Sequence, residues 1–205
     1  NIQTNANPTS YPQLSDDGKV LAYINDGNIG NIYASRAHFS TLTDGVYSRS
    51  NPIGDPTGFT GYGDTSVSLS GTGSFAAAAW VRMGTELPGK NAGNAVTLEE
   101  QNLLMNSTEI VASVYDGSTW TSTRLTKDGT PDLAPATAVG GDGKAIVFWR
   151  SVYTPDPGTQ GSNNLLNFTT RDCIMYRCYN SGTWSEAKML YNGATGSVKA
   201  LQAAM

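Results

Sequence analysis

The sequence predicts an all-β protein built from repeated four-stranded antiparallel sheets. Charged residues make up only 15% of the chain, whereas 23 of its 205 residues are glycine, a balance that disfavours helices and favours short strands joined by tight turns. Apolar runs follow glycine-containing turns at three places, and pairs of tryptophans recur at a spacing of about 65 to 70 residues. Together these observations indicate a β-repeat.

The first kind of repeat is a hairpin whose second strand is apolar on both faces. A polar lead-in, a turn of the Asp-Gly or Gly-x-Gly type and an apolar run occur in that order in residues 12–24, 65–80 and 135–149. Glycine supplies the positive φ that such turns require. A strand that is apolar on both faces is typical of a position between two neighbouring sheets.

A second hairpin follows in two of the three units. Residues 109–125 and 172–189 share an isoleucine, a tyrosine and a Thr-Trp pair at matching places around a turn. Their strands alternate apolar with polar residues, which predicts that one face is wetter than the other. The first unit carries a shorter version, with strands expected at 31–36 and 40–42, so that His38, the only histidine, falls in a turn.

Two successive hairpins form a four-stranded meander, and meanders repeated around an axis are the blades of a β-propeller. A β-sandwich is the alternative, but it does not predict the four-strand period. We expect one partial propeller domain over residues 1–205, with blades at 8–45, 62–130 and 133–192 and with 197–205 as the first strand of a further blade. Closed propellers have about four to eight blades, so the remaining blades are expected from the same or another chain.

Two short segments resemble known propeller families. Residues 11–23, with Tyr-Pro-Gln-Leu-Ser-Asp-Asp-Gly-Lys before an apolar run, resemble the WD40-like (PD40) repeat of TolB-type propellers, although Asp16 stands where that family usually has proline. Residues 113–120 (SVYDGSTW) resemble the Asp-box of sialidase-type propellers, with the aspartate displaced by one place to Asp116. The resemblance implies the propeller architecture and carries no activity with it.

Composition and charge exclude several classes of partner. The formal net charge is −4 and no basic run occurs, so nucleic acid is not an expected partner. The longest apolar stretch, residues 75–81, is far shorter than the roughly 20 residues that a membrane-spanning helix needs, so no membrane insertion is expected. Cys173 and Cys178 lie too far apart within one strand for a disulfide, which predicts free thiols. They also lack the spacing of zinc ligands, so no metal site or cofactor is expected.

Two groups of repeated side chains have structural interpretations. The aspartates of the tight turns are expected to form those turns, with calcium binding as the alternative; they are Asp16, Asp17, Asp116 and Asp142. The tryptophans stand at repeated places in the blades and are expected to pack between sheets rather than to stack on sugars; they are Trp80, Trp120, Trp149 and Trp184.

The long connections between second and third strands are the expected site of function. In a four-stranded meander the tight turns share one end and these connections share the other, and two of them are unusually long, at 81–108 and 150–171. Cationic and aromatic groups together suit a carboxylate or the face of a sugar. The candidate ligand-binding residues are Arg82, Glu86, Arg150, Tyr153 and Asp156. The alternative is that these are solvated loop charges and strand-end residues in salt bridges at the rim.

The sequence therefore predicts a non-catalytic binding or scaffold propeller module of a secreted or cell-surface bacterial protein, which recognises a glycan or a protein through its long loops. Two alternatives stay open. A sialidase-like glycoside hydrolase fragment is implied by the resemblance, with Arg36, Arg82 and Arg150 as the nominated arginine cluster. It requires Arg82 and Arg150 to share a cleft with a buried carboxylate near a tyrosine oxygen. The other alternative is a structural subunit that assembles with other chains through its open ring edges.

Overall fold

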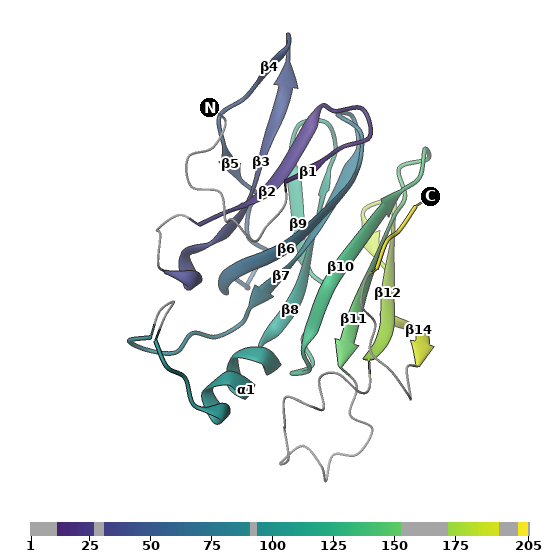
Figure 1. Ribbon diagram of the computed structural model, residues 1–205. Helices are drawn as coiled ribbons and strands as arrows, with labels where there is room; N and C mark the ends of the chain where they lie inside the picture. The colour runs from purple at the N-terminus through teal and green to yellow at the C-terminus, as the bar shows by residue number, and fades with distance from the viewer. Residues whose placement is uncertain (1–11, 27–30, 91–93, 153–171, 193–200, 205) are drawn as a thin grey trace.

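The computed structural model describes residues 12–26, 31–90, 94–152, 172–192 and 201–204. Over these ranges it consists mainly of antiparallel β-sheets with one short α-helix, which confirms the all-β prediction. Three sheets follow one another along the chain and stack side by side (Figure 1). Each sheet is a meander, as expected for a propeller blade.

The first sheet contains β1 (Gln13–Leu14), β2 (Val20–Asn25), β3 (Arg36–Thr43), β4 (Val46–Tyr47) and β5 (Asn51–Pro52), in the order β1-β2-β3-β4 with β5 also paired to β3. The predicted strands at 31–36 and 40–42 are wrong, because β3 runs unbroken between them and pairs with β2 at six positions. His38 therefore lies within β3 opposite Tyr23, and not in a turn.

Two local features replace the predicted hairpin of the first sheet. Residues Ile32–Ala34 form a 3-10 helix, η1, whose start is capped by the Asn31 side chain, which accepts a hydrogen bond from the Tyr33 N–H. The turn comes later, at Asp44 and Gly45, where both residues have positive φ. The first sheet consequently extends beyond residue 45, to β5.

The second sheet contains β6 (Tyr62–Gly71), β7 (Ala76–Met83), β8 (Thr108–Tyr115) and β9 (Trp120–Arg124), in that order. β7 is buried along nearly its whole length, as predicted for a second strand. β8 is buried along its whole length as well, so the predicted wetter face is wrong for this strand. The reason is that the middle sheet takes part in two buried clusters, one with the first sheet and one with the third.

The connection between β7 and β8 contains the helix α1 (Leu98–Asn106), which the sequence analysis did not predict. Thr97 and Glu100 form a capping box at its start. None of its residues is buried, and Leu98 and Leu103 are each 53% exposed. The helix therefore owes more to its cap than to contacts with the core.

The third sheet contains β10 (Asp132–Val139), β11 (Ala145–Val152), β12 (Asp172–Asn180), β13 (Thr183–Trp184) and β14 (Lys188–Asn192), in the order β10-β11-β12-β13 with β14 also paired to β12. Cys173 and Cys178 lie in β12 and are free thiols, as predicted. Residues 201–204, expected in the first strand of a further blade, have no regular secondary structure, and the rest of that segment lies outside the described residues.

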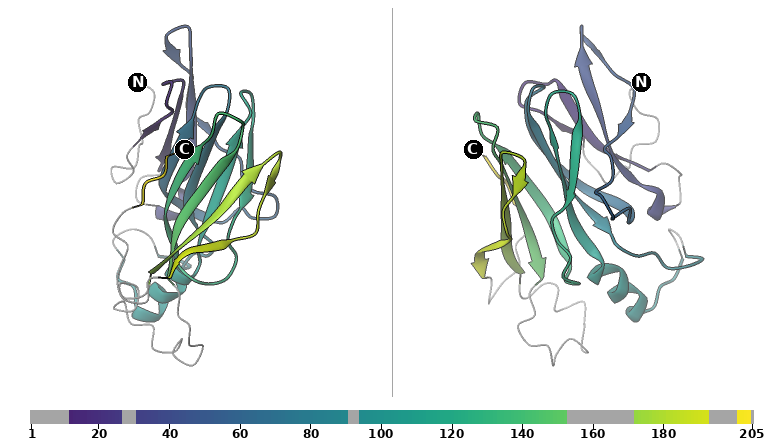
Figure 2. Two further views of the ribbon diagram at one scale, coloured as in Figure 1. Left: turned by 90° about the vertical axis from the view of Figure 1, so that its right-hand side faces the viewer. Right: turned by 180° about the vertical axis from the view of Figure 1, so that it is seen from behind.

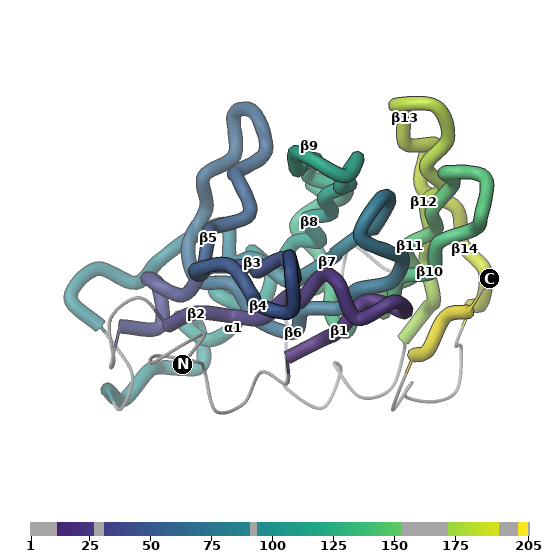
Figure 3. The backbone as a smooth tube through the Cα atoms, turned by 90° about the horizontal axis from the view of Figure 1, so that it is seen from above, coloured from purple at the N-terminus to yellow at the C-terminus, as the bar shows by residue number. Residues whose placement is uncertain are grey.

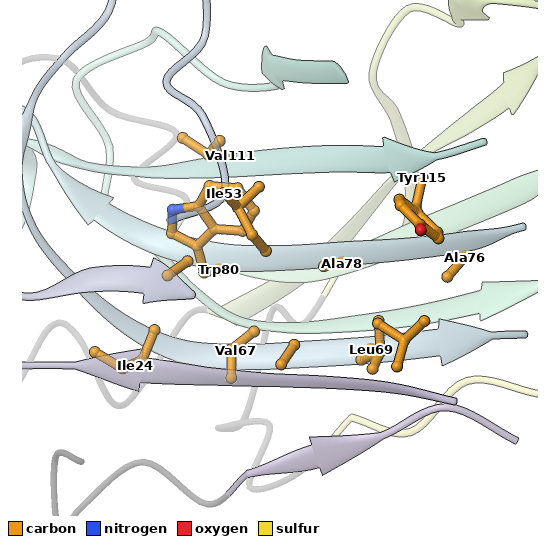
Figure 4. Packing of buried hydrophobic residues seen from close by; sticks show 12 residues of the cluster. Ile24, Ile53, Val67, Leu69, Ala76, Ala78, Trp80, Val111 and Tyr115 are labelled. Carbon is orange, nitrogen blue, oxygen red and sulfur yellow. The ribbon is translucent and has the colours of Figure 1, made fainter. Parts of the chain in front are cut away.

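A tryptophan at each interface packs on apolar residues of the preceding sheet. Trp80 of β7 lies in a buried cluster with Ile24 of the first sheet (Figure 4). Trp149 of β11, at the equivalent position, lies in a second cluster with Ala79 and Ala112 of the second sheet. The other two tryptophans are partly buried, each against one of these clusters. This confirms that the repeated tryptophans pack between sheets.

The strand register shows that the three sheets repeat residue by residue. The second strands carry a repeated aromatic residue, which is Tyr23, Trp80 or Trp149. In each sheet the residue directly before it pairs with the first strand: Ala22 with Gln13, Ala79 with Ser68 and Phe148 with Ala136. The first strands β1, β6 and β10 are thus equivalent, and β6 contacts both of the others. Seen from above, β1 and β6 lie on one side of the stack, opposite β9 and β13 (Figure 3). Hairpin turns gather at one end of the stack and α1 lies at the other (Figure 2).

Candidate functional site

Arg82, the first of the predicted site residues, lies near the end of β7 and has no exposed surface. Its Nε and Nη2 donate to Oδ1 and Oδ2 of Asp64 at 2.6 and 2.8 Å, which makes a bidentate pair. Its Nη1 donates to Asp55 Oδ1 at 2.5 Å and to the Thr60 carbonyl at 3.0 Å. All three guanidinium nitrogens are thus engaged inside the protein, away from any external ligand.

Asp64 makes this ion pair part of the joint between the first and second sheets. Its Oδ2 also accepts a hydrogen bond from the Ala37 N–H at 2.8 Å, and its own N–H donates to the Ser35 carbonyl at 3.0 Å. Gly61 permits the close approach, because a Cβ there would lie 2.7 Å from Arg82 Cδ. A buried charge is tolerated when its partners are this complete. Arg82 therefore holds the framework together.

Arg150 points in a different direction from Arg82. Its Nε lies 3.9 Å from Asp172 Oδ2, and its side chain is 25% exposed. Arg150 follows Trp149 in a regular strand, and Trp149 faces the second sheet, so Arg150 lies on the outer face of the third sheet. Arg82 lies on the face of β7 that meets the first sheet. A sialidase-like cluster requires the two arginines to share a cleft, and they do not.

The remaining predicted residues that the structure describes are Glu86 and Arg36. Glu86 is exposed in the connection after β7. Arg36 donates to the Gly61 carbonyl at 3.4 Å, next to the carbonyl that Arg82 uses, so both arginines are bound to protein oxygens of one loop. Tyr153 and Asp156 lie outside the described residues.

Three of the four turn aspartates, Asp17, Asp116 and Asp142, accept hydrogen bonds from backbone N–H groups, as their turn-forming interpretation predicts. Asp116 Oδ1 accepts hydrogen bonds from the N–H groups of Thr119 and Ser118 at 2.8 Å each, and these bonds hold the pKa of Asp116 well below its usual range. Asp17 Oδ2 accepts the Gly73 N–H at 2.9 Å and so links two neighbouring turns. Among the residues that the structure describes, no group of three or more His, Cys, Asp or Glu side chains could hold a metal ion.

A cavity of about 500 Å³ on the inner side of the stack is the feature that the sequence analysis missed. This inner groove is lined by Gln13, Val67, Ser68, Leu69, Pro135, Ala136, Thr137 and residues 201–204. Its lining includes the same register position from each of the three first strands. Its volume is typical of small-ligand pockets, which span about 300–1,000 Å³.

Two β-bulges precede the groove. The pairing of β6 shifts register between Thr65 and Ser68, and that of β10 shifts between Leu133 and Ala136. At each of these two shifts a non-glycine residue has positive φ, Ser66 at 56° and Ala134 at 50°. Ser66 and Ala134 stand at equivalent places, two residues after the buried Asp64 and Asp132. A bulge bends its strand, and the lining residues begin immediately after each bulge. Backbone strain of this kind concentrates at functional sites.

The groove is chemically neutral. Its described lining combines the hydroxyl and amide groups of Gln13, Ser68, Thr137 and Gln202 with apolar side chains, and it includes no charged or aromatic residue. Ser68 Oγ accepts a hydrogen bond from the Thr137 N–H at 3.0 Å, which ties β6 to β10. Within its sheet, each first strand pairs on one side only, so its other backbone edge lies on the inner side of the stack.

No model of a known protein family matches the sequence, and no curated protein is significantly similar to it. The described part of the chain contains no helix that is long and apolar enough to cross a membrane.

Proposed function

We propose that the chain is a non-catalytic binding module, built like propeller blades, that holds an extended segment of a protein partner in its inner groove. The observation that carries this proposal is the convergence of three equivalent edge strands, β1, β6 and β10, on a neutral cavity of about 500 Å³. Edge strands bind extended peptides through main-chain hydrogen bonds, and neighbouring side-chain pockets add specificity.

The lining favours a peptide over other classes of ligand. An uncharged surface offers no ion pair to a carboxylate or a phosphate. A surface without aromatic rings lacks the flat apolar faces on which sugars stack.

This proposal keeps the predicted class of function and moves its location. Arg82 and Arg150 are engaged with carboxylates of the protein, so the loop-borne site loses its two cations. The groove lies instead on the inner strands, where main-chain atoms do the binding. A secreted or cell-surface bacterial origin remains part of the proposal, on the strength of a chain poor in charge and rich in glycine.

Selection of peptides from a random nonapeptide library tests the proposal. Affinities of the enriched peptides are measured by titration calorimetry for the wild type and for Gln13→Trp, whose indole would fill the groove. Val46→Trp is the matched control, because Val46 is 69% exposed on β4 and does not line the groove. We expect the wild type and Val46→Trp to bind alike and Gln13→Trp to lose at least tenfold in affinity.

Two outcomes would contradict the proposal. Enriched peptides whose affinity is unchanged in Gln13→Trp would place peptide binding outside the groove. Neutral oligosaccharides that bind on a glycan array and are blocked by Gln13→Trp would assign the groove to glycans. Thermal unfolding of each variant confirms that the comparison is made between folded proteins.

A further inference from the structure

The joint between the second and third sheets lacks the arginine that neutralises the joint between the first and second. In the second sheet Asp64 pairs across the strands with Arg82, and in the third sheet the equivalent aspartate, Asp132, pairs with Ser151. Both pairs involve the residue two places after the repeated tryptophan. Asp64 and Asp132 are both fully buried. The two equivalent buried carboxylates thus differ in their cross-strand neighbour, which is a cation for Asp64 and a hydroxyl for Asp132.

Asp132 is only partly satisfied by its neighbours. The Trp149 Nε1–H donates to Asp132 Oδ1 at 3.0 Å. The hydroxyls of Ser151 and Thr126 lie near the carboxylate and favour its charged form. Its other oxygen, Oδ2, has no hydrogen-bond partner among the described residues. An unpartnered buried oxygen is costly for an ionised carboxylate.

The charges that surround Asp132 do not replace the missing arginine. The titratable and charged groups on its side of the joint include Glu109 on β8, Arg124 on β9, Asp128 in the turn after β9, and Cys173 and Arg177 on β12. Asp172 and Arg150 lie on the opposite face of the third sheet. Arg124 already binds Glu109, with its Nη2 2.7 Å from Oε1. Arg177 lies four residues beyond Cys173 along β12, opposite Val147, and no ion pair between it and Asp132 occurs among the described residues. Burial first, and then the negative charge of Asp128, raise the pKa of Asp132 to about 7.

We propose that the joint between the second and third sheets is a proton-operated switch centred on Asp132. In its protonated form Asp132 is neutral and can donate its carboxyl O–H to a neighbouring hydroxyl oxygen, so the sheets remain closely packed. In its ionised form the joint buries a negative charge without the guanidinium that the other joint provides, and the packing of the third sheet on the second loosens. The proton is exchanged with water, so no other reactant is needed.

The indole of Trp149 reports on this protonation directly. Its N–H donates to the titrating carboxylate, whereas the indole N–H of Trp80, at the equivalent place in the other joint, makes no hydrogen bond within the described residues. In ¹⁵N-labelled protein we expect the Trp149 indole resonance to shift with pH between 5 and 9, with a midpoint near 7. The Trp80 resonance serves as the internal control and should not follow that titration.

Two variants assign the titration. Asp132→Asn, which mimics the neutral carboxyl group, should abolish it, whereas Asp128→Asn should keep it and lower its midpoint. A Trp149 resonance that is unchanged across this pH range in the wild type would overturn the proposal, whatever the variants do. A titration that persists in Asp132→Asn would also overturn it.

Amide hydrogen exchange tests the loosening itself. The Thr137 N–H donates to Ser68 Oγ across this joint, so its protection reports on contact between the second and third sheets. After correction for the intrinsic pH dependence, we expect the protection of the Thr137 amide to fall at least fivefold between pH 5.5 and 8.5 in the wild type, and to stay constant in Asp132→Asn. Equal protection of the wild-type amide at both pH values would show that the joint does not respond to the proton.

Discussion

At the scale of single residues, the two buried aspartates show that the cross-strand neighbour determines whether a buried carboxylate has a cationic partner. Asp64 forms a bidentate ion pair with Arg82, which is itself fully buried. Asp132 has an indole N–H and nearby hydroxyls in place of a cation. Removing one partner of a buried ion pair leaves the other charge uncompensated, and this penalty exceeds the net worth of the pair.

Replacement of Arg82 by methionine should therefore destabilise the protein strongly. We expect the free energy of unfolding, measured by urea denaturation at pH 7, to fall by about 3–5 kcal/mol, because Asp64 is left buried and unpaired. Lys144→Met is the control, since the ion pair of Lys144 with Asp142 is exposed and should be worth less than about 1 kcal/mol. The double variant Arg82→Met, Asp64→Asn should recover much of the loss; if it does not, the arginine acts by packing rather than by charge.

The pH dependence of stability should carry the signature of Asp132. Its pKa is about 7 in the folded protein against an ordinary value of 3.8, so between these values the folded state binds a proton that the unfolded state releases. The free energy of unfolding should rise as the pH falls from about 8 to about 5, by up to about 1.4 kcal/mol per pH unit. Below about pH 4 the lowered pKa values of Asp116 and Asp142 reverse the trend, because their stabilisation is lost on protonation.

Urea titrations at a series of pH values check this profile. Asp132→Asn should remove the rise between about pH 8 and pH 5 and leave the acid limb in place. A wild-type stability that falls steadily from neutral pH downward would be incompatible with a buried carboxyl group that prefers to be protonated.

The predicted arginine cluster failed at this same scale. Arg82 comes two residues after its tryptophan and Arg150 comes one residue after, and in a strand that single step sends the side chains to opposite faces. Both spacings are visible in the sequence, so it could have been predicted that the two side chains lie on opposite faces. The carboxylate partners could not be predicted, because Asp64 lies 18 positions before Arg82 in sequence and is brought to it only by strand register.

At the scale of elements, local turn chemistry predicted the hairpins and non-local pairing decided the rest. The hairpins at residues 65–80 and 135–149 formed where their glycine turns placed them. β3 was misassigned because its polar residues read as turn formers, yet pairing with β2 keeps residues 36–41 extended. α1 was missed although Thr97 and Glu100 carry the capping-box pattern, because it buries no apolar stripe.

Gly63 at the start of β6 offers a test of how tightly the first and second sheets meet. Its φ is +49°, and a Cβ there would lie 2.5 Å from the Ile32 carbonyl oxygen, so Gly63→Ala adds a clash to the conformational penalty. Gly45→Ala is the matched control, because Gly45 has φ +77° with open space around it. We expect Gly45→Ala to cost about 1 kcal/mol and Gly63→Ala at least twice as much in thermal or urea unfolding. Equal losses would mean that the backbone of η1 can move away freely.

At the scale of the whole molecule, the stack has a direction. The repeated tryptophans of the second and third sheets face the preceding sheet, and in the first two sheets an alanine one step before the repeated aromatic residue faces the following sheet. The third sheet departs from this rule, because Phe148 stands at the place of Ala79 and Tyr176 at the place of Ala112. Their rings lie 5.8 Å apart on its outer face. A further sheet that carried a tryptophan could not pack there as Trp149 packs on the second sheet.

Exchanging one residue between equivalent positions tests this reading of the stack. Ala112→Tyr copies the third-sheet residue into the second sheet, within the buried cluster that contains Trp149, where overpacking should cost about 1–3 kcal/mol in urea unfolding. It should also shift the Trp149 fluorescence to longer wavelength as the indole is displaced towards water. The reverse change, Tyr176→Ala, removes a partly exposed ring and should cost less, because the outer face of the third sheet does not receive a tryptophan. If Ala112→Tyr were tolerated without loss, the alanines would not be what admits Trp149, and the third sheet could accept another sheet by the same packing.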